Sequence, residues 1–297
     1  MNDLWIILTA SLVAMSASIL GTFLLLRKMS MVGDAISHSV LPGIALAYWL
    51  SGDKSSVWLL PASAAAGVVV SLLIDFLTRK AGIQSDAAIG ISYTCLFAIG
   101  MIMISGWMKG NTDIDQECVL YGDIAFINLD KIIVDGNLYL GPRAFYTVLV
   151  GFVLIVAAVA IGFKGFKLLS FSEEYAISLG INTRLWHYIL MALVSILTVV
   201  SFEVVGAVLV IGFMVIPPAT AKLLTHGLVP MLVVSCLIGV ISATVGYLLA
   251  VWLDVSITGA MVVISGVLFF GVMAVRKNYS SATIEMILPQ KREEAKH

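Results

Sequence analysis

Asp34 and His38 are the residues in this sequence whose types and spacing best suit metal chemistry. If residues 32–51 form a helix, positions four apart lie on one face, about one turn from each other. Imidazole and carboxylate together suit borderline divalent ions such as those of zinc, iron and manganese. The alternative is a hydrogen-bonded Asp–His pair that satisfies itself between helices. Two side chains do not complete a coordination shell, so a metal contact here requires further ligands.

Two more carboxylates stand next to apolar segments. Asp86 opens an apolar run, where it could cap the helix or serve as a gate or entry ligand for a cation. Glu203 lies with Phe202 between two apolar runs, where it could gate an entry or be an ordinary solvated loop carboxylate. The cap and the solvated loop are the simpler interpretations.

Two further segments could form a docking surface for a partner, although the first of them could equally be a surface linker. Residues 173–181 begin with acidic side chains, Glu174 among them, and have Gly180 near their end, a pattern typical of a short capped helix. Residues 206–227 contain Pro217 and Pro218, which are expected to end an apolar helix and turn the chain along the membrane. The short segment after this break could be a lever for a soluble motor or a plain loop. It comprises Pro218, Ala219, Thr220, Ala221, Lys222, Leu223 and Leu224.

The composition indicates which elements must position these residues. The chain has 297 residues, of which 60% are hydrophobic and only 12% charged, and its mean hydropathy is +1.05. A soluble domain has about 45–50% apolar and about 25% charged residues. Apolar runs long enough to cross a bilayer recur along the whole chain. We therefore predict an all-α, polytopic membrane protein.

Hydropathy predicts nine candidate spans, with eight full crossings as the alternative if one segment between residues 186 and 227 is short or re-entrant. Residues 1–275 form the transmembrane domain in this interpretation, and residues 276–297 form a charged, loosely ordered tail. The candidate spans are residues 4–26, 32–51, 57–78, 87–106, 144–163, 186–202, 204–221, 228–252 and 258–275.

The distribution of lysine and arginine predicts the orientation. An external N-terminus and a cytoplasmic C-terminus leave few basic residues outside, as the positive-inside rule requires. The tail would then be cytoplasmic, and the long connection 107–143, which is rich in aspartate, would be external. That connection is either a solvated loop or an acidic rim that attracts a cation or a docking protein. The external basic residues are Lys54, Lys109, Lys131 and Arg143.

Several function classes lack support in the sequence. It contains no Walker A sequence, no G-x-S-x-G and no H-E-x-x-H, so we expect no ATPase or hydrolase activity of its own. Nucleic-acid binding is not expected, because no basic cluster occurs outside the tail.

The motifs together resemble the membrane permease subunits of bacterial zinc, manganese and iron ABC importers. The resemblance covers nearly the whole chain, and its first block, residues 27–43, is the most specific. It rests on residues 27–43, 86–91, 174–181 and 206–221, in that order.

This resemblance implies a compact form of the vitamin B12 permease fold, the type II ABC importer fold, in the bacterial cytoplasmic (inner) membrane. It further implies a second permease copy or paralogue, a cytoplasmic ABC ATPase dimer that binds ATP, and an extracytoplasmic metal-binding protein or lipoprotein. Asp34 and His38 would form part of the path of a transported manganese, zinc or iron ion, with no permanently bound cofactor. Residues 218–227 would be the coupling helix, with Glu174–Ile181 nearby.

Three other functions stay open at this point. One is a permease of the same architecture for an organic metal chelate. Another is a secondary, proton-coupled metal carrier in which Asp34 relays protons. The third is a structural or sensory membrane subunit, which would bind without transport.

Overall fold

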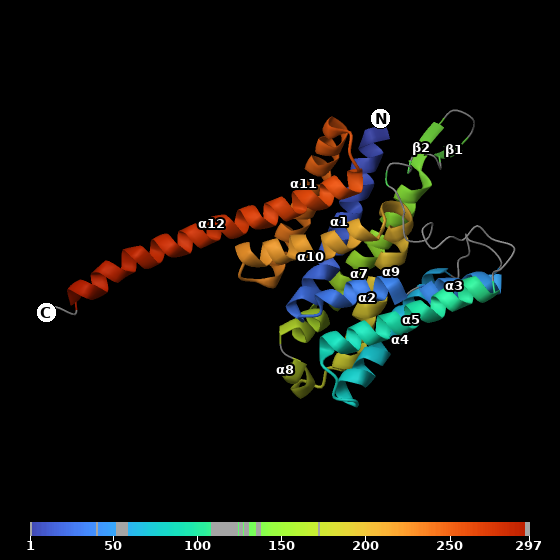
Figure 1. The fold of residues 1–297 in the computed structure, drawn as a ribbon, viewed down its shortest axis with the longest axis horizontal. Helices are drawn as coiled ribbons and strands as arrows, with labels where there is room; N and C mark the ends of the chain where they lie inside the picture. The colour runs from blue at the N-terminus through green and yellow to red at the C-terminus, as the bar shows by residue number, and fades with distance from the viewer. Residues whose placement is uncertain are drawn as a thin grey trace.

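The computed structural model describes residues 2–39, 41–51, 59–107, 124, 127, 131–134, 138–171 and 173–294. The described chain is a bundle of helices joined by short connections, with one small hairpin (Figure 1). Its elements are α1 (Asn2–Leu26), α2 (Ser30–Ser39), α3 (Leu41–Ser51), α4 (Leu59–Arg79), α5 (Ser85–Trp107), β1 (Lys131–Val134), β2 (Leu138–Pro142), α7 (Arg143–Phe171), α8 (Glu173–Ser178), α9 (Thr183–Val205), α10 (Ala207–Leu224), α11 (Leu228–Leu253) and α12 (Ile257–Glu294).

The predicted polytopic helical architecture is confirmed. Seven helices in the described part of the chain are long and apolar enough to cross a membrane, namely α1, α5, α7, α9, α10, α11 and α12. The predicted span 57–78 corresponds to α4, whose apolar portion is the shorter segment Ala65–Thr78. The predicted span 32–51 corresponds to α2 and α3, and both Pro42 and Gly43 are helical in the first turn of α3.

Helix α1 occupies the centre of the bundle and packs most extensively against α10 and α11. Small residues allow this close approach. A side chain on Gly21 would overlap the carbonyl of Met214 in α10, and one on Gly239 of α11 would lie 3.2 Å from Cβ of Ala14. Small residues at helix interfaces are typical of membrane bundles, where helices associate through close packing.

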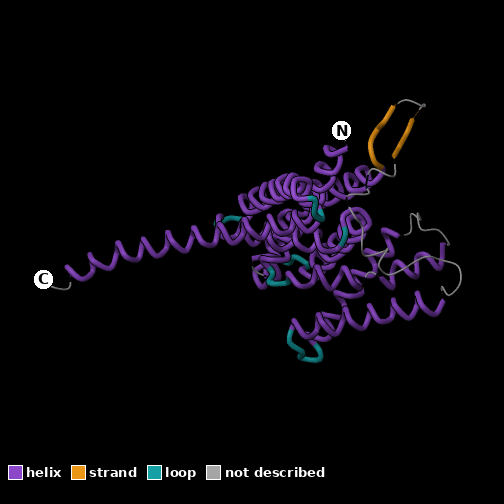
Figure 2. The backbone as a smooth tube through the Cα atoms, turned by 45° about the horizontal axis from the view of Figure 1, so that its top comes forward, coloured by secondary structure: helices purple, strands orange, loops and turns teal. Residues whose placement is uncertain are grey.

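A second group of helices lies beside this centre. Helices α2, α3, α4 and α5 pack on one another, and α4 also packs along α9 (Figure 1). Figure 2 shows the pair of strands, in orange, near the N-terminus and far from the C-terminal end of the chain. Two ends of the molecule can be distinguished by the segments that lie there. The N-terminus and the β1–β2 hairpin lie at one end, and α8 lies at the opposite end (Figure 1).

The predicted helix break at Pro217 and Pro218 is wrong. Both prolines lie inside α10, which continues to Leu224 and is capped at Thr225. Prolines are tolerated inside membrane helices where neighbouring helices compensate for the lost hydrogen bonds. Pro218 cannot donate to the carbonyl of Met214, and Gly21 of α1 packs directly on this carbonyl.

The predicted junction between the sixth and seventh spans is displaced. Helix α9 continues past Phe202 and Glu203 to Val205, and only Gly206 separates it from α10. Gly206 has φ 79° and ψ 162°, a backbone conformation almost restricted to glycine. A glycine, and not the charged residue, therefore ends the helix.

Two helices extend beyond their predicted spans. Helix α7 continues past residue 163 to Phe171, so Lys164 and Lys167 are helical and not part of a connection. Helix α12 continues through Arg276 to Glu294, where a loosely ordered tail was expected, and it projects away from the bundle (Figure 1).

The hairpin is the one addition to the helical expectation in the described residues. Strands β1 and β2 pair antiparallel, with Lys131 opposite Pro142 and Val134 opposite Leu138. Gly141, at φ 111°, packs against the Trp5 ring of α1, since a Cβ there would lie 2.7 Å from ring carbons. Most of the predicted acidic connection 107–143 lies outside the described residues.

Candidate functional site

Helix α2 presents Asp34 and His38 on a face that is only partly covered. The other side of the helix is buried in the bundle. In the last turn of α2, Ser39 donates from Oγ to the carbonyl of Ala35 at 2.7 Å. Asp34 and His38 remain accessible, with 45% and 34% of their side chains exposed. The buried residues of α2 are Val32, Gly33, Ala35, Ile36 and Ser39.

The two side chains meet as their spacing predicts. Oδ1 of Asp34 lies 3.5 Å from Nε2 of His38, one turn further along α2. The His38 ring also faces α5, with its centroid 6.1 Å from that of Tyr93 and 5.9 Å from that of Phe97. The Phe97 ring stands nearly perpendicular to the imidazole, at 86°. These aromatic rings restrict the orientation of the imidazole, and its partly exposed edge remains close to the carboxylate.

Asp34 and His38 alone cannot enclose an ion. Among the described residues, no group of three or more histidine, cysteine, aspartate or glutamate side chains is placed to hold a metal. A closed structural site has four protein ligands, whereas a pathway requires contacts weak enough to release the ion. The pair therefore suits a transient contact, with its remaining ligands from water or another chain.

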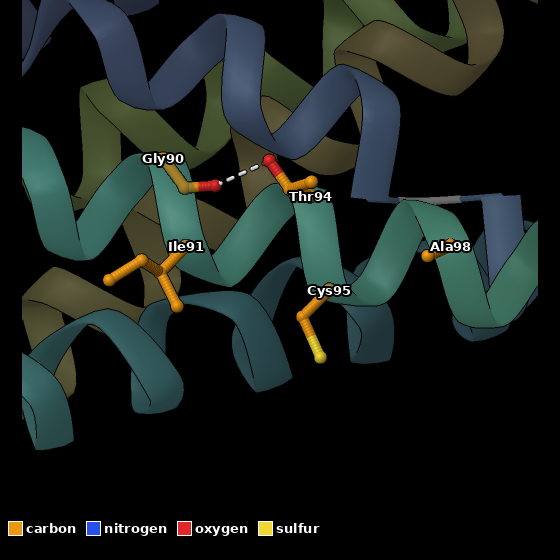
Figure 3. Close-up of a pocket in the computed structure, with 5 residues that line it drawn as sticks. All are labelled: Gly90, Ile91, Thr94, Cys95 and Ala98. Carbon is orange, nitrogen blue, oxygen red and sulfur yellow. Dashed lines mark hydrogen bonds between the residues drawn. The ribbon is translucent and has the colours of Figure 1, made fainter.

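A shallow groove lies on the outer face of α5, beside the aromatic residues that contact His38. It has a volume of about 490 Å³. Thr94 donates from Oγ1 to the carbonyl of Gly90 at 2.7 Å, which keeps its polar group within the helix (Figure 3). Gly90 and Ala98 are small, so another helix can approach the backbone of α5 closely here. The lining residues are Gly90, Ile91, Thr94, Cys95 and Ala98.

Asp86 and Glu203 are not brought to the Asp34–His38 pair by any contact of the described residues. Asp86 lies in the first turn of α5, after Ser85, so it suits the helix dipole but is not the residue preceding the helix. Glu203 lies in the last turn of α9, and its side chain is outside the described ones. Their predicted gate or entry roles remain predictions.

The two predicted docking segments differ in accessibility. Helix α8 projects from the bundle, and Glu174 and Gly180 are exposed. Pro218, Thr220 and Ala221 are buried inside the bundle, and exposure begins at Lys222. Ala219 and Leu223 are partly buried, while Leu224 is 53% exposed.

Sequence reasoning missed a polar cluster at the α8 end of the bundle. Arg27, directly after α1, contacts Nδ1 of His187 in α9 through its guanidinium group. The adjacent Tyr188 donates from its hydroxyl to Oδ2 of Asp75 in α4 at 3.3 Å. A histidine inside an apolar run is a signal that was available, because ionisable residues in membrane helices usually have partners.

Comparison with protein families decides the class of this membrane protein. The model of the ABC 3 transport family matches residues 3–276. The chain belongs to this family. It is similar, at 44% identity over 90% of each chain, to the manganese transport system membrane protein MntD of Bacillus subtilis. It is also similar, at 39% identity over 89% of this chain and 71% of the relative, to the zinc transport system membrane protein TroD of Treponema pallidum.

Solved structures agree with the family assignment. The fold matches PsaBC from Streptococcus pneumoniae, solved in complex with Fab, with a TM-score of 0.72 and 28% identity over 90% of this chain and 89% of that one. A metal-chelate type ABC transporter in an inward-facing conformation shares the fold alone, with a TM-score of 0.59 and 17% identity over 91% and 85% of the two chains. The expected resemblance and the type II importer fold are confirmed. This ABC 3 family permease is a multi-pass membrane transport subunit of the metal-ion class.

Proposed function

We propose that this permease is the translocation subunit of an ATP-driven importer of a divalent transition-metal ion, and that Asp34 and His38 contact the ion during its passage. The observation that carries the proposal is the 3.5 Å separation of Oδ1 and Nε2 on the accessible face of α2. Both groups bind divalent transition metals. The 44% identity to a manganese transport protein makes Mn²⁺ the first ion to test, before Zn²⁺ and Fe²⁺.

A second copy of this chain is the proposed source of the missing ligands. The α5 groove adjoins the Tyr93–Phe97 face that contacts His38, so a copy packed on the groove would lie beside the Asp34–His38 pair. A two-fold axis there would add a second carboxylate and a second imidazole, as isologous packing requires. A paralogous permease with the same two residues would serve equally well.

Helix α8 and the end of α10 are the proposed contact surface for a cytoplasmic ABC ATPase. Three apolar side chains of the α8 region, Tyr175, Ile177 and Leu179, are more than half exposed. They lie outside the apolar helices that could cross a membrane, so lipid does not cover them in this proposal. Pro218, Thr220 and Ala221, at the start of the expected coupling helix 218–227, are buried in the bundle, whereas Lys222 and Leu224 are exposed. The docking role therefore falls mainly to α8.

The proposed orientation in the membrane follows from which segments lie at each end of the molecule. The end with α8 and Arg27 would face the cytoplasm, where the positive-inside rule expects basic residues. The N-terminus and the β1–β2 hairpin would then face outward. An extracytoplasmic metal-binding protein would deliver the ion at that outer end.

Metal uptake into proteoliposomes tests the proposal. The permease is reconstituted with its candidate ATPase, and Mn²⁺, Zn²⁺ and Fe²⁺ are each presented on the delivery protein with ATP or a non-hydrolysable analogue. We expect ATP-dependent accumulation that is lost in Asp34→Asn and His38→Gln. Asp254→Asn is the matched control, because Asp254 has φ 54° at the end of α11 and asparagine tolerates that conformation.

Two outcomes would overturn the proposal. Uptake that continues without ATP and follows the pH gradient would identify a proton-coupled carrier. Normal uptake in both Asp34→Asn and His38→Gln would remove these residues from the path.

A further inference from the structure

Three consecutive side chains near the start of α9 contact three different helices. The Trp186 ring lies against Gly162 and Gly165 of α7, where any side chain on those glycines would overlap it. His187 contacts Arg27 at the end of α1, and Tyr188 donates to Asp75 of α4. Successive residues project about 100° apart on a helix, so one turn can contact three neighbours.

The two polar contacts involve the helices that precede and follow the segment carrying Asp34 and His38. Helix α1 precedes α2, and only residues 27–29 connect them. This connection is itself fixed, because Lys28 adopts φ 58° and the Met29 amide donates to the carbonyl of Leu24 at 2.9 Å. Helix α4 follows α3, and Asp75 lies near the C-terminal end of α4, away from α3. Helix α9 therefore contacts the helix that leads into the α2–α3 segment and the helix that leaves it.

The N-terminal end of α9 is joined to the exposed helix α8 by a short connection that hydrogen bonds hold in place. Gly180, at φ 76°, lets the Ile181 amide donate to the carbonyl of Ala176 at 3.0 Å, which closes α8 in a Schellman-type turn. Oδ1 of Asn182 then accepts from the Leu185 amide at 3.2 Å and begins α9. Because residues 179–182 are held by these hydrogen bonds, a displacement of α8 should carry the start of α9 with it.

We propose that His187 and Tyr188 are positioning residues that transmit movement of α8 to the connection before α2, through Arg27, and to α4, the helix that follows α3, through Asp75. This inference rests on the proposed function, because it takes α8 as the surface that an ATPase moves. Neither residue touches the ion. His187 is 6% exposed and Nδ1 must be unprotonated to accept from the Arg27 guanidinium, so the imidazole serves as a fixed acceptor between helices.

The ratio of metal uptake to ATP hydrolysis tests the inference in the reconstituted transporter. Tyr188→Phe removes one hydroxyl, and His187→Phe removes the ring acceptor while keeping a ring of similar size. Hydrogen bonds to charged groups, such as these two, change an equilibrium by roughly tenfold to a hundredfold. We expect the uptake per ATP to fall by about that factor in each variant, with ATPase binding retained. His187→Asn, which returns an acceptor near the position of Nδ1, should recover part of the loss.

Tyr247→Phe is the matched control. It also removes one tyrosine hydroxyl that donates to an aspartate, since Tyr247 donates to Asp3 at 2.8 Å. Its partner lies in the first turn of α1, away from the Arg27 end of that helix. Uptake per ATP should be unchanged in this variant.

A second measurement, the rate of cysteine labelling on α2, does not depend on which substrate is transported. Met31, 69% exposed near the start of α2, is replaced by cysteine after serine has replaced the three native cysteines. We expect ATP to change the labelling rate of Met31→Cys, and we expect this change to be lost when Tyr188→Phe and His187→Phe are combined. An ATP-dependent change that persists in the combined variant would overturn the inference. An unaltered uptake ratio would do so as well. Failure of the metal proposal would instead appear as absent uptake with the labelling change intact.

Discussion

Oδ1 of Asp34 lies 3.5 Å from Nε2 of His38, and the two side chains belong to one helix and project from one of its faces. The separation is thus set by the local geometry of α2 and not by the docking of distant segments. A ligand pair on one helix stays together when the helix moves. When α2 moves, the Asp34–His38 pair can face a different direction while the distance between its two side chains is preserved. This suits a site that an ion enters from one side of the membrane and leaves on the other.

The chemical difference between the two ligands predicts how metal preference can be altered. His38→Asp would replace the imidazole with a second carboxylate, and all-oxygen sites favour Mn²⁺ over the more nitrogen-seeking Zn²⁺. We expect the ratio of Zn²⁺ to Mn²⁺ uptake to fall by about tenfold, equivalent to about 1.4 kcal/mol. Initial uptake rates from mixtures of the two ions measure this ratio. A ratio equal to that of the unaltered protein would argue that His38 does not contact the ion.

The aromatic contact with His38 leads to a separate prediction. Phe97→Ala would remove the ring that stands at 86° to the imidazole, 5.9 Å away between centroids. Such pairs contribute about 0.5–1.5 kcal/mol, so the half-saturating metal concentration should rise by roughly twofold to tenfold. Maximal uptake should change little, because the ligands remain. Phe269→Ala on α12 is a control that removes an aromatic ring far from His38 in sequence and contact.

Close packing between α1 and α10 should make Gly21 intolerant of a side chain. Gly21→Ala would force a methyl group against the carbonyl of Met214, and overpacking costs about 1–3 kcal/mol. Gly266→Ala in α12 is the matched control, since nothing lies within 4 Å of a Cβ at that position. Thermal unfolding in detergent should show a lower midpoint for Gly21→Ala only. Equal midpoints would contradict the close approach of the two helices.

The α5 groove should control association between two permease chains. Ala98→Trp would fill the groove with a large ring and hinder helix packing against it. We expect the fraction of paired chains, measured by cross-linking in membranes, to fall by about tenfold if pairing loses at least 1.4 kcal/mol. Ile161→Trp, at a position 88% exposed on α7, adds the same ring elsewhere and should leave pairing unchanged. Undiminished pairing in Ala98→Trp would place the interface on another surface.

The apolar runs predicted the helices well, because membrane crossing requires a minimum length and the runs had no alternative structure. The turn spacing of Asp34 and His38 likewise predicted their contact. Helix ends were harder to predict. Glu203 was interpreted as a loop residue because it is charged, yet the backbone conformation of Gly206 ends the helix.

Contacts between helices that are distant in the chain could not be predicted from the sequence. Nothing in residues 206–221 reveals that Gly21 packs on the Met214 carbonyl beside Pro218, so the prolines were expected to break the helix. The Arg27–His187 contact joins the residue that follows the first predicted span to a residue of the sixth, and only tertiary packing brings them together.

The single-residue junction at Gly206 has a consequence for biosynthesis. Two membrane helices joined without a loop leave no polar segment that could rest outside the bilayer while the second helix is made. Exposed backbone groups are costly in hydrocarbon, so we expect α9 and α10 to leave the translocation machinery together. A chain truncated after Gly206 should therefore integrate α9 poorly, while one truncated after α10 should integrate both helices, and glycosylation mapping of the nascent chains can compare the two.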